Sequence, residues 1–364
     1  MRKTSSRKKP VRIAIIGAGG MGNTHADCFR KIPGCELVAA VDVDAGRAAE
    51  FCAAHGIPHS FGRVDEMLAG VDVDAVSIVT PDVFHAAQSI QCLAAGKHVL
   101  CEKPLATDYR EASAMVSAAR KAGTVNMVNF SYRNWSCIQA VAALVRKGGV
   151  GEIRHVEASY LQAWLVSKAW GDWRTSPKWL WRLSGRHGSK GALGDIGVHI
   201  VDFATYPAGP IKRVHCKLGT FGKAPKNRVG EYKLDANDSA VMTVEFASGA
   251  LGTIHTTRWM GGHANRLFLK IAGTRGTVEI DSEKTTEGYR ICAGGDLDTA
   301  TWRDVAVKPT PTNYERFITS IRTGRREQPD FARGAEIQRV LDACFESDAR
   351  GMPVAVCSKR AARR

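Results

Sequence analysis

The sequence is short of acidic residues. Its 36 Asp and Glu stand against 51 Lys and Arg, which gives a formal net charge of +15. Such an excess suggests a nucleic-acid partner, but ten of the positive charges lie near the two ends, at residues 2–12 and 359–364. The body is only mildly basic, and it contains no zinc-finger spacing and no RNA-recognition signature. We therefore predict no nucleic-acid partner.

The chain also lacks a long apolar run and any CxxC pair. No stretch approaches the ~20 apolar residues of a membrane span. The apolar run after the basic N-terminus is short and leads into glycines without a cleavage pattern, so we expect neither a membrane segment nor a signal peptide. Ten scattered cysteines indicate small buried side chains in a reducing, cytoplasmic compartment, with no disulfide framework and no metal site. A length of 364 residues is enough for two domains.

A glycine-rich turn follows a buried strand near the N-terminus. Residues 11–17 (VRIAIIG) are a β-branched run, and GAGGMG at 17–22 precedes a helical pattern. The backbone amides of such a turn approach a pyrophosphate at the positive end of a helix. A second strand at 36–43 contains Asp42, twenty residues past Gly22. A carboxylate at this position would accept hydrogen bonds from the ribose hydroxyls of the cofactor. Since no arginine follows Asp42 immediately, NAD is favoured over NADP. The alternative is an aspartate that only forms a turn.

Strand and helix patterns then alternate as far as residue 130. The predicted helices are 45–55, 66–69, 83–95 and 108–122, and the predicted strands are 59–61, 75–80, 98–103 and 124–130. This alternation indicates an α/β fold with a doubly wound parallel sheet. Ligands of such sheets bind beyond the carboxyl ends of the strands, where Thr80, His85, Glu102 and Lys103 occur. Lys103, followed by Pro104, would place an ammonium group beside the cofactor, although a surface lysine needs no such role.

Three ionisable residues occur in the apolar segment 191–202 (GALGDIGVHIVD). If the segment is helical, Asp195, His199 and Asp202 share one face at i,i+4 and i,i+3 spacing. The other positions are apolar nearly all round, so the helix is expected to be buried and its polar groups hydrogen-bonded or functional. A core histidine capped by a carboxylate is the alternative to a catalytic one.

The second half changes to longer, antiparallel strands. After a helix at 136–147, strands are predicted at 153–162, 239–246, 250–258, 266–272 and 277–280, and helices at about 313–322 and 334–349. An α+β domain therefore follows the parallel sheet. Five of the eight tryptophans lie between residues 164 and 190, among Lys and Arg side chains. They could line a pocket for a neutral or an anionic sugar, or they could pack this connection onto the sheet or a subunit interface.

Four motifs in this order resemble the Gfo/Idh/MocA family of NAD(P)-dependent sugar and polyol oxidoreductases. They are GAGGMG at 17–22, TPDVFH at 80–85, EKP at 102–104 and GALGDIGVHIVD at 191–202. The resemblance extends from residue 11 to about 350. It implies an N-terminal Rossmann domain and a C-terminal domain built on an open, mostly antiparallel sheet, which commonly mediates dimers or tetramers.

The resemblance also implies site residues. It makes Lys103, Asp195 and His199 catalytic, and we expect Asp202 to support them. The stretches at 129–135 and 160–164 are similar to members that oxidise pyranoses. The predicted cofactor residues are Gly17, Gly19, Gly20, Met21, Gly22, Asp42, Thr80, His85, Glu102 and Lys103. The predicted substrate residues are Tyr132, Arg133, Trp173, Arg174, Arg182, Asp195 and His199.

The prediction divides the chain into a disordered basic tail at 1–10, an NAD-binding Rossmann domain at 11–130, a substrate-binding and oligomerisation domain at 131–350 and a basic tail at 351–364. The predicted reaction is hydride transfer between NAD and a secondary hydroxyl of a carbohydrate. His199 would act as general base, Asp195 would orient it, and Lys103 would stabilise the reacting oxygen. A redox-neutral NAD-dependent glycosidase acting on an acidic glycoside, such as a sulfoquinovoside, is the second hypothesis. A non-catalytic sugar or NAD sensor is the third, although such a sensor needs no proton-transfer set.

Overall fold

A computed structural model describes residues 9–356, which form two compact units. The first unit runs to Ser131 and also takes in Pro311–Gln338. The second comprises Tyr132–Thr310 and the residues from Arg339 onward. The division at 130–131 expected from the sequence did not include the return of 311–338 to the first unit. The parts of the predicted basic tails at residues 1–8 and 357–364 lie outside the described residues.

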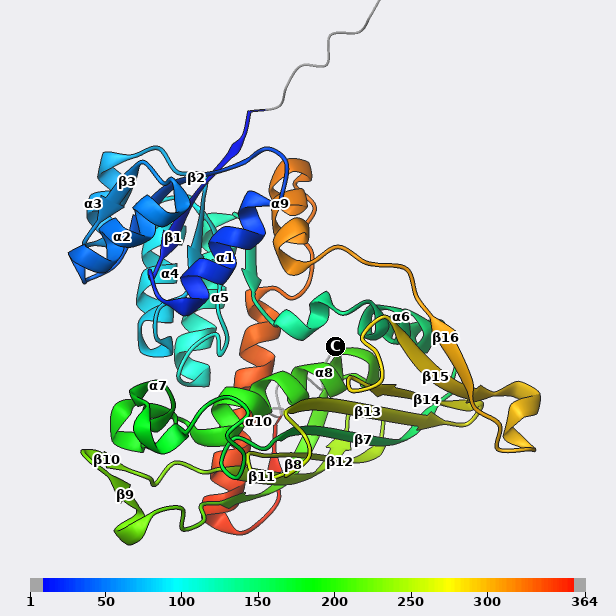
Figure 1. The fold of residues 1–364 in the computed structure, drawn as a ribbon. Helices are drawn as coiled ribbons and strands as arrows, with labels where there is room; N and C mark the ends of the chain where they lie inside the picture. Colours follow the sequence, from blue (N-terminus) through cyan, green and yellow to red (C-terminus); the bar gives the residue numbers. More distant parts are fainter. Residues whose placement is uncertain (1–8, 357–364) are drawn as a thin grey trace, which may run out of the picture. The chain divides into compact units, whose positions relative to one another are not determined.

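The first unit is built on a six-stranded parallel sheet with the order β3-β2-β1-β4-β5-β6. Its strands are β1 (Val11–Ile16), β2 (Cys35–Val41), β3 (His59–Phe61), β4 (Ala75–Ile78), β5 (His98–Cys101) and β6 (Asn126–Val128). Its helices include α1 (Gly20–Arg30), α2 (Ala45–His55), α3 (Val64–Gly70), α4 (His85–Ala94), α5 (Tyr109–Ala122) and α9 (Asn313–Thr323) (Figure 1). The order reverses between β1 and β4, which confirms the predicted doubly wound sheet. Sheets of this kind bind their ligands at the carboxyl ends of the strands on either side of the reversal.

The core of the first unit explains why residues 311–338 return to it. The buried side chains of Ile13 and Ile15 on β1 belong to one hydrophobic cluster with Phe29 of α1 and Phe317 of α9. The ring of Tyr314, also on α9, meets Phe29 edge-on at a centroid distance of 5.3 Å. Because α9 packs against α1 and β6 and its apolar side chains belong to this cluster, it is part of the core of this unit.

The second unit is built on a nine-stranded sheet with the order β16-β15-β14-β13-β7-β12-β11-β8-β17. Its strands are β7 (Ile153–Gln162), β8 (Ile211–Gly219), β11 (Ser239–Phe246), β12 (Leu251–Thr257), β13 (Asn265–Gly273), β14 (Gly276–Asp281), β15 (Gly288–Ala293), β16 (Arg303–Ala306) and β17 (Val354–Ala355). β7 and β12 run parallel, and the other neighbouring pairs are antiparallel. The predicted open, mostly antiparallel sheet is therefore confirmed.

Helices lie along this sheet in Figure 1. They include α6 (Ser136–Arg146) and α8 (Val198–Ala208), and α8 packs against β7, β12 and β13. The later part of α10 (Phe331–Arg350) is tied to β8, where Ser347 Oγ accepts a 2.9 Å hydrogen bond from the amide of Cys216. The antiparallel pairing of β17 with β8, with Val354 buried, shows that the predicted tail from residue 351 begins too early.

No helix within residues 9–356 is both long enough and apolar enough to cross a membrane.

Candidate active site

The glycine-rich turn leads from β1 into α1 and leaves part of its backbone open. Gly17 has a φ of +109°, and a Cβ there would lie 2.9 Å from a main-chain carbon just beyond β4. A Cβ on Gly22 would come within 2.4 Å of the Gly17 oxygen, so the turn packs too tightly for a side chain at either position. At Gly19 and Gly20 a Cβ would meet nothing within 4 Å, and the neighbouring Met21 is exposed. This open backbone at the start of α1 fits the pyrophosphate of a dinucleotide.

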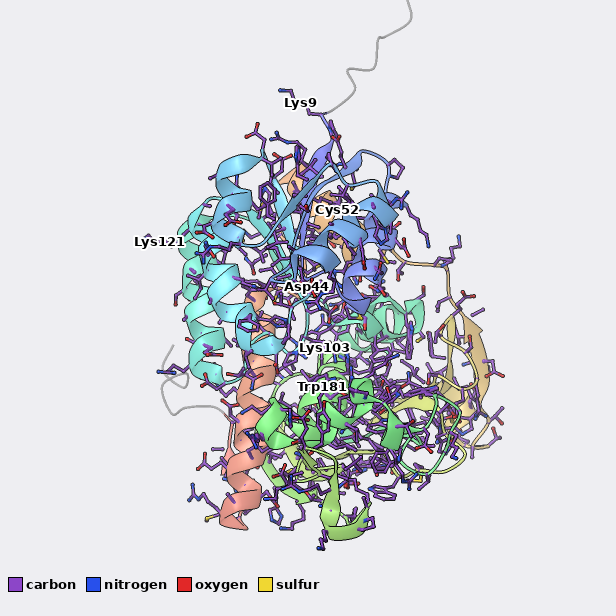
Figure 2. The ribbon with its side chains drawn as sticks, turned by 60° about the vertical axis from the view of Figure 1, so that its left-hand side comes forward. Lys9, Asp44, Cys52, Lys103, Lys121 and Trp181 are labelled. Carbon is purple, nitrogen blue, oxygen red and sulfur yellow. The ribbon has the colours of Figure 1, made fainter. Side chains whose placement is uncertain are left out.

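Asp42 lies directly after β2, and its carboxylate faces the glycine-rich turn. Its Oδ2 accepts a 2.9 Å hydrogen bond from the amide of Ala18. Its Oδ1 accepts a 3.0 Å bond from the amide of Asp44, which is at the start of α2 (Figure 2). Burial favours the neutral acid, but hydrogen bonds from Arg47 and from these amides lower the pKa of Asp42 below its usual value. Asp42 thus lies beside the glycine-rich turn, and its contact with the ribose stays a prediction. Its partner Arg47 on α2 was not foreseen.

His85 connects the turns that follow β4 and β5. Its Nδ1 lies 2.8 Å from the carbonyl oxygen of Pro104, and its Nε2 lies 2.9 Å from that of Thr80. The Thr80 hydroxyl donates a 2.7 Å bond to Gln88. The side chain of His85 therefore holds the two strand ends together, while the Thr80 hydroxyl ties its own turn to α4. Their predicted contacts with the cofactor stay predictions.

Glu102 follows β5, and its carboxylate is directed into the interior. Oε1 lies 2.9 Å from Nε2 of His25 and accepts a 2.7 Å bond from Nδ2 of Asn129. Oε2 accepts a 3.1 Å bond from the amide of Lys103. Burial opposes ionisation, but the hydrogen bonds and charges of His25, Lys103 and Asn129 lower the pKa of Glu102 to about 2. This geometry gives no support to the predicted cofactor contact of Glu102, because the carboxylate instead holds the turn that carries Lys103.

His25 and Tyr314 complete this buried network. Nδ1 of His25 lies 2.7 Å from Ser77 Oγ, and the Tyr314 hydroxyl accepts a 3.1 Å bond from Asn129 Nδ2. The rings of His25 and Tyr314 meet edge-on at 4.9 Å. Neither residue was foreseen. The one signal available in the sequence was a histidine in the helix directly after the glycine-rich turn.

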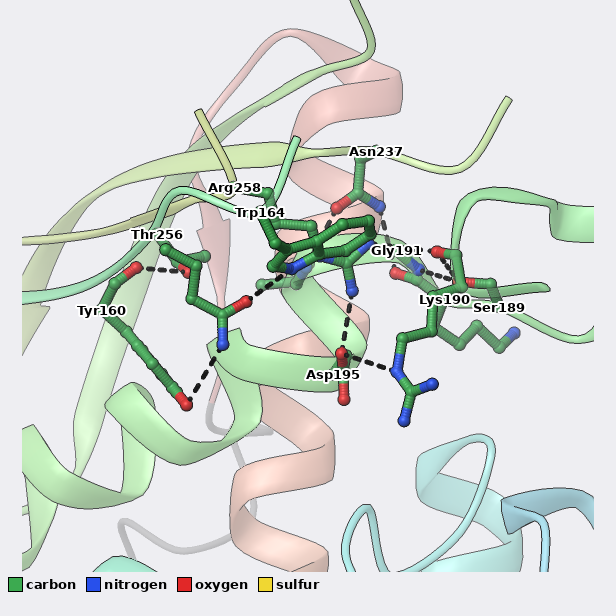
Figure 3. Close-up of polar contacts among 12 residues, drawn as sticks. Tyr160, Trp164, Ser189, Lys190, Gly191, Asp195, Asn237, Thr256 and Arg258 are labelled. Carbon is green, nitrogen blue, oxygen red and sulfur yellow. Dashed lines mark hydrogen bonds and ion pairs between the residues drawn. The ribbon is translucent and has the colours of Figure 1, made fainter. Parts of the chain in front are cut away.

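The segment 191–202 is helical, but it does not form one regular α-helix. A π-helix at Leu193–Gly197 precedes α8. The side chain of Asn237 accepts a 2.9 Å bond from the first amide of the π-helix and donates a 3.0 Å bond to the carbonyl oxygen of Lys190 (Figure 3). A Cβ on Gly191 would lie 2.4 Å from Asn237, so this approach requires glycine. The predicted i,i+4 geometry of a regular helix is therefore altered around Asp195.

Two arginines share one oxygen of Asp195 (Figure 3). Nη2 of Arg258 donates a 2.9 Å bond to Oδ2, and the Arg258 guanidinium is fully buried. Nε of Arg182 lies 3.6 Å from the same oxygen, while Asp195 itself stays 29% exposed. Arg258 was not foreseen, since it directly follows β12, far from Asp195 in the sequence. The carboxylate expected to orient His199 is itself held by a buried cation.

The tryptophan-rich connection contains the other predicted substrate residues of this unit. Trp173 is buried, and its indole N–H donates a 3.2 Å bond to the carbonyl oxygen of Leu165. Arg174 lies 4.6 Å over the Trp173 ring, and Arg182 donates a 2.6 Å bond to the carbonyl oxygen of Lys178. The buried members of this hydrophobic cluster are Trp164, Leu165, Trp173, Leu180, Leu183 and Leu234. Trp173 thus packs the connection, as the alternative interpretation held.

A polar row lies beside His199, which is on α8. The row consists of Tyr132, Tyr160, Gln162 and Asn265. The ring of His199 meets Tyr132 edge-on at 4.7 Å and lies 6.3 Å from the ring of Tyr160. The Tyr160 hydroxyl pairs with that of Tyr132 and donates a 2.7 Å bond to Asn265 Oδ1, which also accepts a 2.9 Å bond from Gln162. Burial and the neighbouring Tyr132 raise the pKa of Tyr160 well above its usual value, so its hydroxyl stays protonated.

Arg133 and Asp202 form a buried bidentate ion pair. Arg133 Nε and Nη2 donate bonds of 2.7 and 2.6 Å to the two Asp202 oxygens, and each side chain is 2% exposed. The Arg133 guanidinium also lies 3.8 Å over the ring of Tyr206. These contacts account for the charge of Arg133 within the fold and give no support to its predicted role in substrate binding. The supporting role expected of Asp202 stays a prediction.

Comparison with known proteins identifies the family. The chain matches the oxidoreductase family with an NAD-binding Rossmann fold over residues 11–130 and the GFO/IDH/MocA C-terminal domain over residues 138–279. D-glucoside 3-dehydrogenase of Escherichia coli is 31% identical over 97% of this chain and 99% of its own. The chain belongs to the Gfo/Idh/MocA family. Levoglucosan dehydrogenase of Pseudarthrobacter phenanthrenivorans is 27% identical over 93% of this chain and 96% of its own.

Solved structures of oxidoreductases share the fold over nearly the whole chain. An oxidoreductase domain protein from Kribbella flavida matches with a TM-score of 0.87 at 32% identity, over 96% of this chain and 100% of its own. A levoglucosan dehydrogenase in complex with NADH and levoglucosan matches with a TM-score of 0.85 at 26% identity, with the same coverage. Together with the NAD-binding family, these matches confirm the predicted cofactor, NAD.

Proposed function

We propose that this Gfo/Idh/MocA protein transfers hydride between NAD and a secondary hydroxyl of a sugar or sugar derivative. The observation that carries the proposal is the polar row beside His199. Tyr132, Tyr160, Gln162 and Asn265 present hydroxyl and amide groups next to a nearly buried imidazole. Groups of this kind recognise the hydroxyls of a carbohydrate. The relatives named for levoglucosan and D-glucosides support the same substrate class.

Each proposed catalytic group has a distinct task. His199 takes the proton of the reacting hydroxyl as general base. Asp195, held by Arg258 and Arg182, orients His199 and accepts a hydrogen bond from the substrate. Lys103 donates a hydrogen bond to the reacting oxygen and stabilises the negative charge that develops there. Bound NAD+ supplies the hydride acceptor.

A neutral sugar satisfies these groups without an added anion. Arg182 already has Asp195 as a countercharge, and its guanidinium caps the carbonyl oxygen of Lys178. Arg258 is buried against Asp195. We therefore propose uncharged pyranosides as the substrates. The acidic glycosides, which the basic composition of this connection indicated as an alternative, are not favoured by these contacts.

The test is a substrate screen with purified protein and NAD+. Levoglucosan, methyl glucosides and free hexoses are incubated in turn, and NADH is followed by its absorbance. We expect turnover with at least one of them, and a loss of about 100-fold or more in kcat for His199→Asn and for Lys103→Met, with NAD+ still bound. Near wild-type turnover in both variants would contradict the assigned roles.

Matched controls and a second substrate class sharpen this test. His215→Asn on β8 and Lys121→Met on α5 change exposed residues of the same types and are expected to leave turnover unchanged. Nitrophenyl glucosides are tested in parallel. Release of nitrophenol without net NADH formation would instead identify the redox-neutral glycosidase and overturn the dehydrogenase proposal.

We also propose a homodimer or homotetramer formed through the nine-stranded sheet. Val241 on β11 and Leu251 on β12 are apolar yet exposed in the single chain. Light scattering of the purified protein measures the mass. We expect a multiple of the 39.4 kDa chain, reduced towards a single chain by Val241→Glu together with Leu251→Glu.

A further inference from the structure

The carboxylate of Asp42 has no room for an additional donor. Its Oδ2 accepts bonds from the amide of Ala18 at 2.9 Å and from Nε of Arg47 at 3.0 Å. Its Oδ1 accepts bonds from the amide of Asp44 at 3.0 Å and from Nη2 of Arg47 at 2.5 Å. A carboxylate offers about four lone-pair positions. All four face donors of this chain, so a ribose that binds Asp42 has to displace one of them.

The four donors differ in how easily they can leave. The amides of Ala18 and Asp44 belong to the glycine-rich turn and to the start of α2, and they cannot move without the backbone. Arg47 contributes the other two bonds through a side chain that is 48% exposed. Its further contact, to Asp44 at 3.7 Å, is between exposed groups. A half-exposed ion pair contributes little to stability, so Arg47 is the donor that a ribose replaces.

The ion pair of Arg47 and Asp42 also changes the charge that the adenosine ribose of a cofactor meets beside Asp42. An aspartate alone repels the 2′-phosphate of NADP+, which is the usual basis of NAD selectivity. In the protein without a cofactor, Arg47 neutralises the negative charge of Asp42. Once released from Asp42, its planar guanidinium suits the bidentate recognition of a phosphate group.

We propose that Arg47 determines the cofactor selectivity of this protein. It competes with the ribose hydroxyls of NAD+ for Asp42, and it supplies the countercharge for the 2′-phosphate of NADP+, so that the protein binds both dinucleotides. The inference depends only on the nucleotide site. It is independent of the sugar substrate proposed above, because binding is measured with no sugar present.

The experiment is calorimetric titration of the purified protein with NAD+ and NADP+ separately. In Arg47→Ala we expect NAD+ to bind about two- to fivefold more tightly, because its competitor for Asp42 is removed. We expect NADP+ to bind at least about tenfold more weakly, because the phosphate loses its partner and meets Asp42 alone. Adenosine 2′,5′-bisphosphate and AMP, which lack the nicotinamide, should show the same opposite changes.

Arg63→Ala is the matched control. Arg63 lies just after β3, next to β2 in the sheet, and pairs with Asp65 at 2.9 and 3.0 Å, without a contact to Asp42 among the described residues. Both dissociation constants are expected to stay within about twofold in this variant. A thermal melt of each variant verifies folding, and Arg47→Lys provides a second variant that keeps the charge but not the planar fork. We expect it to retain part of the NADP+ affinity lost in Arg47→Ala.

Three results would overturn the proposal. The first is wild-type protein that does not bind NADP+ at about 100 times its dissociation constant for NAD+. The second is an Arg47→Ala variant whose affinities for the two dinucleotides stay the same or fall together. The third is a loss of NADP+ binding in Arg63→Ala and not in Arg47→Ala. A failed sugar screen would leave all three measurements unaffected.

Discussion

The guanidinium of Arg258 is fully buried and donates a 2.9 Å hydrogen bond to Asp195 Oδ2. A buried cation requires a countercharge, because its transfer out of water is otherwise too costly. The amide of Arg258 is itself fixed by a 3.0 Å bond to the carbonyl oxygen of Asp238, which directly precedes the neighbouring strand β11. Asp195 therefore serves the fold of the second unit as well as the proposed chemistry, and its variants need a measurement of stability beside one of activity.

Removal of the Arg258 guanidinium is expected to lower both the stability and the activity of the protein. In Arg258→Met, Asp195 keeps Arg182 at 3.6 Å but loses its buried hydrogen bond. We expect the free energy of unfolding to fall by about 1–3 kcal/mol and kcat to fall because Asp195 is less well oriented. The affinity for NAD+ should not change. Urea unfolding and steady-state kinetics test this, with Arg258→Lys, which keeps the charge, expected to be intermediate. A variant as stable and active as the wild type would show that Arg258 does not hold Asp195.

The buried pair of Arg133 and Asp202 is suited to a double-mutant cycle. Asp202→Asn alone leaves the 2%-exposed guanidinium without its bidentate carboxylate. We expect it to cost about 3–5 kcal/mol of stability, while the combination of Arg133→Met with Asp202→Asn should cost less than the sum of these two single changes. Chemical denaturation of the four proteins gives the coupling energy. If the two losses in the free energy of unfolding were additive, the two charges would not stabilise each other in the folded protein.

Glu102 gives the first unit a distinct acid sensitivity. Its pKa is lowered from 4.5 to about 2 in the folded protein, so the unfolded chain takes up this proton first as the pH falls. Stabilisation by the ionised carboxylate is therefore present above about pH 4.5 and is lost as the pH falls towards 2, by up to about 3 kcal/mol in total.

The comparison of wild type with Glu102→Gln isolates this effect. The difference in their free energies of unfolding should be constant above about pH 5 and should narrow at lower pH. Urea titrations at a series of pH values measure it. Glu66→Gln, an exposed position on α3, is the control and should show a difference that varies little with pH. A constant difference for Glu102→Gln down to pH 3 would contradict the lowered pKa.

Substitutions at two glycines of the glycine-rich turn test the packing of the turn and its binding of the cofactor separately. Gly22→Ala places a Cβ 2.4 Å from the Gly17 oxygen, and we expect it to destabilise the first unit by about 1–3 kcal/mol. Gly19→Ala meets nothing within 4 Å and has a φ of −86°, so its stability should stay within about 1 kcal/mol of the wild type. The added methyl occupies the space proposed for the pyrophosphate, and the affinity for NAD+ should fall about tenfold or more. Thermal melts with and without NAD+ distinguish the two effects. Unchanged NAD+ affinity in Gly19→Ala would place the pyrophosphate elsewhere.

Strands β1, β2, β4 and β5 of the first unit could be read from the sequence because each is a short, mostly apolar run buried on both faces. Ile13 and Ile15 illustrate this pattern on β1. β15 and β16 were missed because they are short and their apolar and polar residues alternate only weakly. The four-residue helix α7 (Pro177–Leu180) in the tryptophan-rich connection was missed as well, since Leu180 packs in a cluster with Trp173 and Leu183 and the helix is too short for a helical periodicity.

The proposed site was predictable where its residues occur in ordered motifs. Asp42 and Lys103 follow buried strands, and Asp195 and His199 lie in one helical segment. The π-helix was not predictable, because Asn237 holds its first amide from a position 44 residues away. Gln162 and Asn265 also come together only when β7 pairs with β13.

The sequence by itself determined the family, the parallel sheet with its dinucleotide turn, and the acidic and basic groups available for chemistry. These features depend on local patterns and on the order of motifs along the chain. Only the tertiary structure decided which charges meet: Asp42 with Arg47, Asp195 with Arg258, and Asp202 with Arg133. The last two pairs join residues 63 and 69 positions apart. An ion pair depends on a separation of about 3 Å, and only the packing of strands and helices against one another sets such a distance.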